Sequence, residues 1–334
     1  MINNLIIDPP SYHYMANQLF NPADENLNRD GTLLPFIRLK QYFNEFGKQV
    51  NTIDAIDGSN LEPYDFISFS EPRTARLNSK IIAQANKSIL VLLEPKLIRP
   101  RSYRELRKYG AEFDELYCYN AKQIPSYLRD KHRQLFFPQA SKSVQCGGGK
   151  RLNKCVIIAG AHVNFFNRNE NYSERIRAIA SLSRYNFIDL YGRGWDQGYR
   201  KLKLNPTYVR YKRNLMKSYK GRCSNKLDYY TNYDYAICFE NENTHGYITE
   251  KIFDCLLSGC IPIYKGAPNI SEFIPKECFI DFNSFGSYLA LYNFLKNMSD
   301  QTKQKYRDAA KKYMSSMEYL RFYNSLINIF RDDK

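Results

Sequence analysis

The densest group of residues able to do chemistry lies in the second half of the chain, directly after a predicted buried strand. The strand is Tyr235–Phe239, and the polar segment after it reads Glu-Asn-Glu-Asn and then, from Gly246, Gly-Tyr-Ile-Thr-Glu-Lys. We expect a helix from Glu250 with Thr249 as its N-cap. A lysine in the first turn, Lys251, opposes the helix dipole unless an anion binds the first amides. The segment therefore indicates an anion site; an ordinary capped helix with an exposed lysine is the alternative.

Two more predicted strand ends carry residues suited to a ligand. Arg193 lies between two glycines after the strand Phe187–Tyr191, where its guanidinium could bind a phosphate through two hydrogen bonds or form a structural ion pair. Gly266 and Pro268 follow the strand Ile261–Tyr264. They fit either a close approach of the backbone to a ligand or a simple surface turn.

The elements that must position these residues alternate between apolar strands and amphipathic helices, which is typical of parallel βαβ units. Ligands bind outside the carboxyl ends of such strands. The run 139–150 is rich in Ser, Lys and Gly and predicts a linker. We therefore expect two doubly wound domains, 1–146 and 151–334. In the first, the main predicted strands are Asn4–Ile7, Phe66–Phe69, Ile89–Leu93 and Leu116–Tyr119.

The charge of the chain favours anionic partners. The 334 residues carry a net charge of +15, and ten Lys or Arg lie between Arg200 and Lys226. Part of this basic segment could attract an anionic acceptor or a membrane surface. Charge alone also admits a nucleic-acid-binding protein, but the basic residues form no motif for reading grooves or bases, so we expect no nucleic acid partner.

Cysteine and histidine usage gives no sign of a metal site. The eight cysteines include no C-x-x-C pair, the four histidines are scattered, and we expect the cysteines to be small buried side chains in a reducing compartment. No signal peptide and no apolar run of about 20 residues is evident. The expected location is the cytoplasm, with a peripheral position on the inner membrane face as an option.

The segment from Asp189 to Met298 resembles the fucosyltransferases of glycosyltransferase family 10, the α-1,3/1,4-fucosyltransferases and their bacterial relatives. The resemblance rests on the run F-E-N-x-x-x-x-G-Y-I-T-E-K-I-F-D from Phe239, then G-C-I-P-I-Y-x-G and F-I-D, together with D-L-Y-G-R-G-W from Asp189. In the first half it rests only on Leu93–Pro100, where this chain has Glu-Pro and relatives often have Glu-Ser.

This resemblance implies an α/β fold of GT-B type, with two Rossmann-like domains facing across a cleft. It implies transfer of L-fucose from GDP-fucose to a glycan hydroxyl with inversion and with no required metal or other cofactor. Arg193 and Lys251 would meet the diphosphate, and Asn241, Tyr247 and Glu250 would line the nucleotide and sugar. The acceptor would be an oligosaccharide or a lipopolysaccharide-type glycan. A GT-B transferase using another GDP-sugar, or an inactive glycan-binding homologue, is the alternative.

The resemblance also assigns the general base to Glu94. A single displacement needs a carboxylate within reach of the acceptor hydroxyl and fixed positive charge at the leaving diphosphate. Glu94 follows the predicted strand Ile89–Leu93, which suits the first task. In the alternative interpretation Glu94 is a structural partner of Arg99 or Arg101, and Glu71 is then the next candidate for the base.

Overall fold

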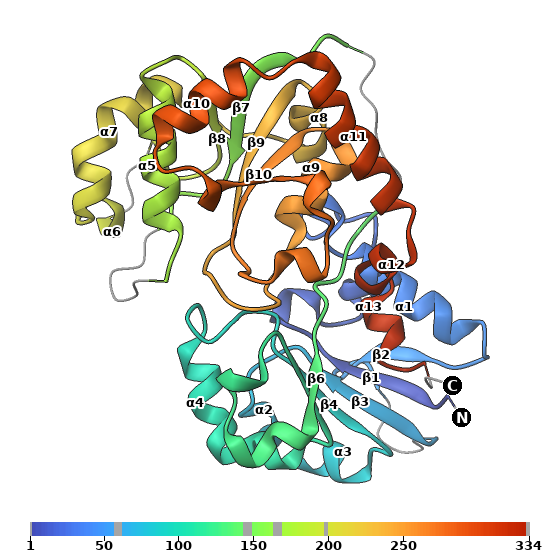
Figure 1. Ribbon diagram of the computed structural model, residues 1–334. Helices are drawn as coiled ribbons and strands as arrows, with labels where there is room; N and C mark the ends of the chain where they lie inside the picture. The colour runs from blue at the N-terminus through green and yellow to red at the C-terminus, as the bar shows by residue number, and fades with distance from the viewer. Residues whose placement is uncertain (1, 57–61, 143–148, 163–168, 197–199, 332–334) are drawn as a thin grey trace. The chain divides into compact units, whose positions relative to one another are not determined.

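The computed structural model describes residues 2–56, 62–142, 149–162, 169–196 and 200–331. The chain divides into two compact units (Figure 1): Met1–Ser141 with Leu320–Lys334 form one, and Lys142–Tyr319 form the other. Most of the predicted linker, 143–148, lies outside the described residues. Both units are layered α/β structures, each built around one parallel sheet.

The first unit contains a six-stranded sheet in the order β2-β1-β3-β4-β5-β6, and every neighbouring pair is parallel. The central strands β3 and β4 are buried at every position, as expected for a sheet covered on both faces. Sequence analysis missed β2 and β6, because these edge strands are three residues long and lack an apolar run. The strands are β1 (Asn4–Asp8), β2 (Val50–Thr52), β3 (Tyr64–Ser68), β4 (Ser88–Val91), β5 (Glu115–Cys118) and β6 (His132–Gln134).

Four helices precede the second unit in the chain. The first begins where the hydrophobic spacing predicted it, and its buried residues include Phe36, Leu39 and Phe43. The last has proline at its first turn, where a missing N–H costs no hydrogen bond. The helices are α1 (Leu34–Asn44), α2 (Thr74–Leu77), α3 (Ser79–Gln84) and α4 (Pro100–Tyr109).

The C-terminal segment returns to the first unit instead of completing the second, as the predicted domain 151–334 required. Arg38 on α1 donates to the carbonyl of Tyr323 at 2.8 Å and lies over its ring. Phe43 packs edge-on against Phe330, with ring centroids 5.1 Å apart. The helices involved are α12 (Met317–Tyr323) and α13 (Ser325–Asn328). An amphipathic helix shows that one face is buried but not against which partner, so the sequence could not decide this placement.

The second unit contains a five-stranded parallel sheet in the order β11-β10-β9-β7-β8. The strand before the polar segment, β9, is buried at all seven positions, which explains its continuous apolar sequence. The predicted strands of this half are all present. They are β7 (Leu152–Ile158), β8 (Ile188–Tyr191), β9 (Tyr233–Phe239), β10 (Ile261–Lys265) and β11 (Ile280–Asp281).

Seven helices of the second unit accompany this sheet (Figure 1). The helix after the polar segment, α9, buries Ile252, Phe253 and Leu256 and ends at Gly259, whose φ of 68° suits a glycine C-cap. Within the described part of the chain, no helix is both long and apolar enough to cross a membrane. The helices are α5 (Tyr172–Ser183), α6 (Arg200–Lys203), α7 (Pro206–Ser218), α8 (Lys226–Tyr230), α9 (Glu250–Ser258), α10 (Tyr288–Lys296) and α11 (Asp300–Met314).

Candidate active site

The five residues expected at the donor all lie at the carboxyl edge of the second unit's sheet, where parallel sheets bind ligands. Arg193 follows β8, and Asn241 follows β9. Tyr247 lies in the loop after β9, and Glu250 and Lys251 begin α9. The parallel arrangement of the sheet thus brings segments of the chain far apart in sequence to one edge.

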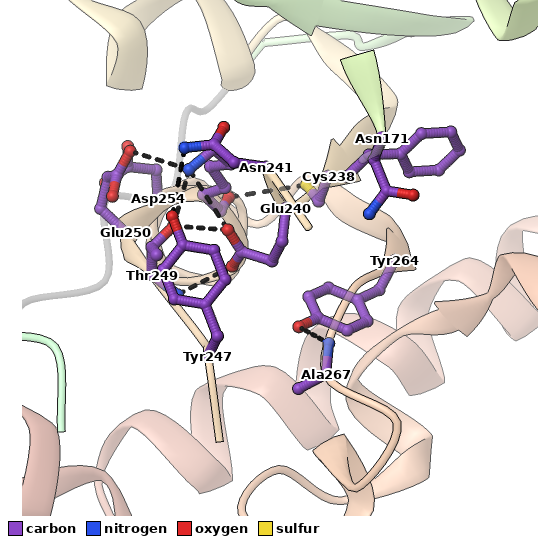
Figure 2. Close-up of polar contacts among 12 residues, drawn as sticks. Asn171, Cys238, Glu240, Asn241, Tyr247, Thr249, Glu250, Asp254, Tyr264 and Ala267 are labelled. Atoms are coloured by element: carbon purple, nitrogen blue, oxygen red, sulfur yellow. Dashed lines mark hydrogen bonds and ion pairs between the residues drawn. The ribbon is translucent and has the colours of Figure 1, made fainter. Parts of the chain in front are cut away.

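Glu240, which sequence analysis did not select, organises this edge. Its side chain is completely buried directly after β9. One carboxylate oxygen accepts the backbone N–H of Thr249 at 2.8 Å, and the other accepts the Thr249 hydroxyl at 2.8 Å and lies 3.2 Å from Lys251 Nζ. Figure 2 shows Glu240 bonded to Thr249 below Asn241. A carboxylate following a fully apolar strand was the available sequence signal, because a buried charge needs partners.

Thr249 does not cap α9 in the way the sequence predicted. Its side chain makes no capping hydrogen bond to the helix. The hydroxyl instead donates to Glu240 and accepts from Lys251 Nζ at 2.8 Å. The first-turn amides of α9 therefore receive no cap from this side chain, which leaves the helix N-terminus suited to an anion.

Lys251 is a paired, largely buried side chain and not the exposed lysine of the alternative interpretation. Its side chain is 25% exposed, and Nζ lies 3.2 Å from Glu240 and 3.5 Å from Glu250. Burial alone would lower the pKa of Lys251, but the two carboxylates outweigh it and raise the pKa above its usual value. Lys251 is therefore a fixed positive charge at every pH near neutrality, and the carboxylates offset its unfavourable position at the helix N-terminus.

Glu250 is held in its ionised form. Burial tends to raise the pKa of its carboxyl, but the charges of Lys251 and Lys226, together with its own backbone N–H, lower that pKa to about 2. Its carboxylate is about one-third exposed, so it can also accept hydrogen bonds from a ligand. A constantly ionised acceptor suits the hydroxyl groups of a sugar.

Asn241 and Tyr247 are brought together by an arginine that sequence analysis missed. Arg175 on α5 is buried, and its guanidinium donates to the Phe239 carbonyl and to Asn241 Oδ1, the latter at 3.0 Å. Asn241 Nδ2 in turn lies 3.1 Å from the Tyr247 hydroxyl. Burial lowers the pKa of Arg175. The signal was an arginine among the apolar positions of a helix, where a charge must find acceptors.

Gly266 is required by Glu240, which neither interpretation of the sequence anticipated. A Cβ at this position would lie 2.6 Å from Glu240 Cγ and 2.5 Å from the Tyr264 hydroxyl. That hydroxyl accepts the backbone N–H of Ala267 at 3.0 Å (Figure 2). The glycine therefore permits close packing around the buried carboxylate, and Pro268 is exposed.

Arg193 differs from the other four because its side chain is exposed. Its backbone is nevertheless fixed, since its carbonyl accepts the N–H of Ala161 at 2.9 Å. The preceding Gly192 has a φ of 139°, and a Cβ there would lie 2.0 Å from the Ala159 carbonyl oxygen. The chain thus holds a mobile guanidinium on a rigid backbone, which is suited to binding a charged ligand from solvent.

Glu94 lies in the first unit, half-buried after β4 at the carboxyl edge of that unit's sheet. Tyr103 donates to its backbone carbonyl at 3.3 Å. Arg101, one of its two alternative partners, forms an ion pair with Glu105 at 2.8 Å. Glu71, the second candidate base, follows the neighbouring strand β3, and its Oε2 lies 3.2 Å from Arg73 Nε.

Metal ligation was assessed for the described residues alone. Among them, no three His, Cys, Asp or Glu side chains gather in a way that could hold a metal ion. The seven described cysteines are buried and unbridged, and Cys146 lies outside the described residues.

Comparison with known proteins places this edge in a family. Residues 159–324 match the model of glycosyltransferase family 10 (fucosyltransferase), C-terminal part. An alpha-(1,4)-fucosyltransferase of Arabidopsis thaliana is 39% identical over 70 residues, covering 21% of this chain and 18% of the relative. An alpha-(1,3)-fucosyltransferase of Helicobacter pylori is 33% identical over 72 residues, covering 22% and 15%. The matched segments thus span less than a fifth of either relative.

Solved structures are similar over almost the whole chain. An alpha1,3-fucosyltransferase crystallised with GDP has a TM-score of 0.52 at 13% identity, covering 100% of this chain and 92% of that one. WaaG, a glycosyltransferase involved in lipopolysaccharide biosynthesis, has a TM-score of 0.55 at 12% identity, covering 98% and 99%. These likenesses confirm the GT-B fold. With the match over residues 159–324, they show that the chain belongs to glycosyltransferase family 10, the fucosyltransferases.

Proposed function

We propose that this protein transfers L-fucose from GDP-fucose to a hydroxyl group of a glycan, with inversion at the anomeric carbon and without a required metal. Family membership and the likeness to fucosyltransferase structures with GDP and GDP-fucose support the donor. The linkage would be of the α-1,3/1,4 type. The observation that carries the proposal is the N-terminus of α9, where Lys251 is held charged and Thr249 does not cap the amides.

Each residue of this edge has a role in the proposed reaction. Lys251, the α9 amides and Arg193 would stabilise the charge that develops on the leaving GDP. Glu250, constantly ionised, would accept hydrogen bonds from donor hydroxyls, and Asn241 and Tyr247 would line the same site. Glu94 would take the proton of the acceptor hydroxyl as it attacks.

Nucleotide binding tests the donor assignment. We expect GDP to raise the melting temperature in the presence of EDTA, by an amount that grows with its concentration, and UDP to do so less. Lys251→Ala should weaken GDP binding by about 1–3 kcal/mol, the range for a charge-assisted hydrogen bond. Lys305→Ala, an exposed position on α11, is the matched control. Loss of binding in EDTA, or equal stabilisation by UDP, would contradict the assignment.

Glu94→Gln tests the base, because it preserves shape and removes the proton acceptor. Transfer should fall roughly 10²–10⁴-fold, while GDP affinity should remain close to normal because its binding residues lie in the other unit. If the variant folds and transfers normally, Glu71 becomes the candidate. If it loses stability but not turnover per folded molecule, Glu94 is structural.

The acceptor and location remain broader proposals. An oligosaccharide or a lipopolysaccharide-type glycan is compatible with the family. A transferase using another GDP-sugar, or an inactive glycan-binding homologue, is separated from the main proposal by incubation with a panel of GDP- and UDP-sugars. We also propose a cytoplasmic location with peripheral contact to the inner membrane face, which flotation with anionic vesicles would test.

A further inference from the structure

The strand order of the first unit marks a second place where a ligand would bind. From β1 the chain forms β2 on one side, and then β3 on the other. In open α/β sheets, the crevice at such a reversal, outside the carboxyl ends of the strands, is the usual ligand site. Here it lies at the ends of β1 and β3, next to β4 and Glu94.

A buried carboxylate ties the two strand ends together. Asp8, the last residue of β1, accepts hydrogen bonds from Ser68 Oγ and from Thr74 Oγ1, both at 2.7 Å. Ser68 ends β3, and Thr74 begins α2. These bonds fix the backbone from which the next segment leaves the sheet.

That segment presents two exposed rings. Tyr12 is 76% exposed, and its ring centroid lies 3.9 Å from that of the exposed His13. Ser11 caps the short turn that holds them, since its hydroxyl accepts the His13 N–H. An aromatic ring exposed at a sheet's ligand-binding edge offers a flat apolar surface on which a partner can bury area.

The backbone after the rings is held in an uncommon conformation. Ala16 and Asn17 have φ values of 51° and 59°, in the left-handed region that non-glycine residues seldom adopt. Asp54 accepts the Ala16 N–H at 2.6 Å, and Thr52 bonds both the amide and the side chain of Asn17. Such conformations persist where surrounding contacts enforce them, and they concentrate at ligand sites. The loop bearing the rings is therefore anchored at both ends.

The polar groups beside the rings favour a neutral ligand over a phosphorylated one. In the described part of the chain, Glu71 Oε2 is buried, lies near Arg73 and accepts no hydrogen bond. Asp8, Glu71 and Glu94 place three carboxyl groups along the ends of adjacent strands. These would repel phosphate, while a sugar hydroxyl can donate to them.

We propose that Tyr12 and His13 form a subsite for the glycan acceptor, on which the C–H face of a neutral sugar ring stacks while Glu71 accepts one of its hydroxyls. The proposal rests on the proposed function for the reaction that follows binding. Neighbouring strands lie about 4.8 Å apart, so the ends of β1 and β4 are separated by about 10 Å. The subsite would therefore hold a ring beyond the one whose hydroxyl meets Glu94.

Acceptor kinetics test this subsite. Tyr12→Ala should raise the acceptor KM about tenfold, as the loss of a contact residue commonly does, with kcat, GDP-fucose hydrolysis and the GDP-induced melting shift unchanged. Tyr12→Phe should restore the normal KM because it keeps the ring. Phe46→Ala is the matched control: Phe46 is 53% exposed and lies just before β2, at the opposite edge of the same sheet.

Saturation-transfer NMR with a panel of neutral disaccharides (lactose, cellobiose and chitobiose) tests binding without turnover. We expect contact with at least one disaccharide in the native protein and in Phe46→Ala, and its loss in Tyr12→Ala. Tyr12-dependent binding without fucosyl transfer would keep the subsite and reject the proposed function. Fucosyl transfer with a normal acceptor KM in Tyr12→Ala, or no disaccharide binding in the native protein, would overturn the subsite.

Discussion

The two ends of β9 carry similar chemistry used in different ways. At its start, the buried Asp234 accepts Lys303 at 2.7 Å and Arg307 at 2.6 Å, both from α11. Beyond its end, the buried Glu240 binds Thr249 and Lys251. Each cluster joins a carboxylate next to one strand to cations on a helix, and each satisfies a charge that burial would otherwise make costly.

The two clusters differ in what they leave for a ligand. The Lys303 side chain is only 6% exposed, and α11 is capped by Ser299, whose hydroxyl accepts the Thr302 N–H at 3.1 Å. Lys251 is 25% exposed, and Thr249 makes no cap on α9. The cluster at the amino edge of the sheet is thus a closed brace, while the one at the carboxyl edge keeps a charge and a helix terminus available. Burial of paired charges by itself does not mark a functional site; the hydrogen-bonding capacity that remains does.

The largest expected effect comes from breaking the brace. Asp234→Ala leaves Lys303 buried without its main partner and should lower the free energy of unfolding by about 3–5 kcal/mol. Urea denaturation measures this loss, and GDP affinity of the folded fraction should be normal. Asp300→Ala, which removes the fully exposed second partner of Lys303, should leave stability near the native value. A similar loss in both variants would show that Asp234 has no special role.

Removing the charge of Glu240 should affect both stability and binding, which distinguishes it from Asp234. Glu240→Gln replaces charge-assisted hydrogen bonds and should cost about 1.5–3 kcal/mol of folding free energy. Because Lys251 and Thr249 lose their anchor, GDP affinity should also fall. Isothermal titration with GDP and urea denaturation measure the two effects. Normal GDP affinity in a destabilised variant would make this cluster a second brace.

Packing around Glu240 gives a further test. Gly266→Ala forces a methyl group against the Glu240 side chain and should cost about 1–3 kcal/mol, the usual range for overpacking. Gly286→Ala is the control, since a Cβ there meets nothing within 4 Å. Thermal unfolding of the two variants compares them directly. Equal melting temperatures would mean that the loop after β10 can shift without cost.

Acid titration should distinguish Glu250 from an ordinary surface carboxylate. Its folded pKa of about 2 lies below the ordinary value of 4.5, so its stabilising contribution is present above pH 4.5 and is lost as the pH falls through 2. The difference in unfolding free energy between the native protein and Glu250→Gln should therefore shrink across this interval. A difference that is constant with pH would contradict the ionic pairing with Lys251.

The smallest effect on folding is expected for the basic surface of α6 and α7, away from both clusters. Neutralising the exposed Lys203, Arg210 and Lys212 to Gln should leave stability unchanged and slow acceptor capture at low salt more than at high salt. Initial rates across a salt series measure this. An unchanged salt dependence would mean that these charges only solvate the surface.

The sequence by itself determined much of the second unit. The continuous apolar run of β9, the glycine that ends α9 and the polar residues between them predicted the strand, the helix and the location of the site. These are local signals, because the burial of a strand and the period of a helix are encoded in neighbouring residues. The family motif lies in the same segment and identified Asn241, Tyr247 and Lys251.

Only the tertiary structure decided the contacts that join distant segments. Arg175 meets Asn241, 66 residues away, and Gly266 is required by Glu240 on another strand. The C-terminal helices α12 and α13 show an apolar face in their sequence, yet their packing with α1 was not predictable. A local pattern specifies that a charge or an apolar face must be buried; which partner buries it depends on the path of the whole chain.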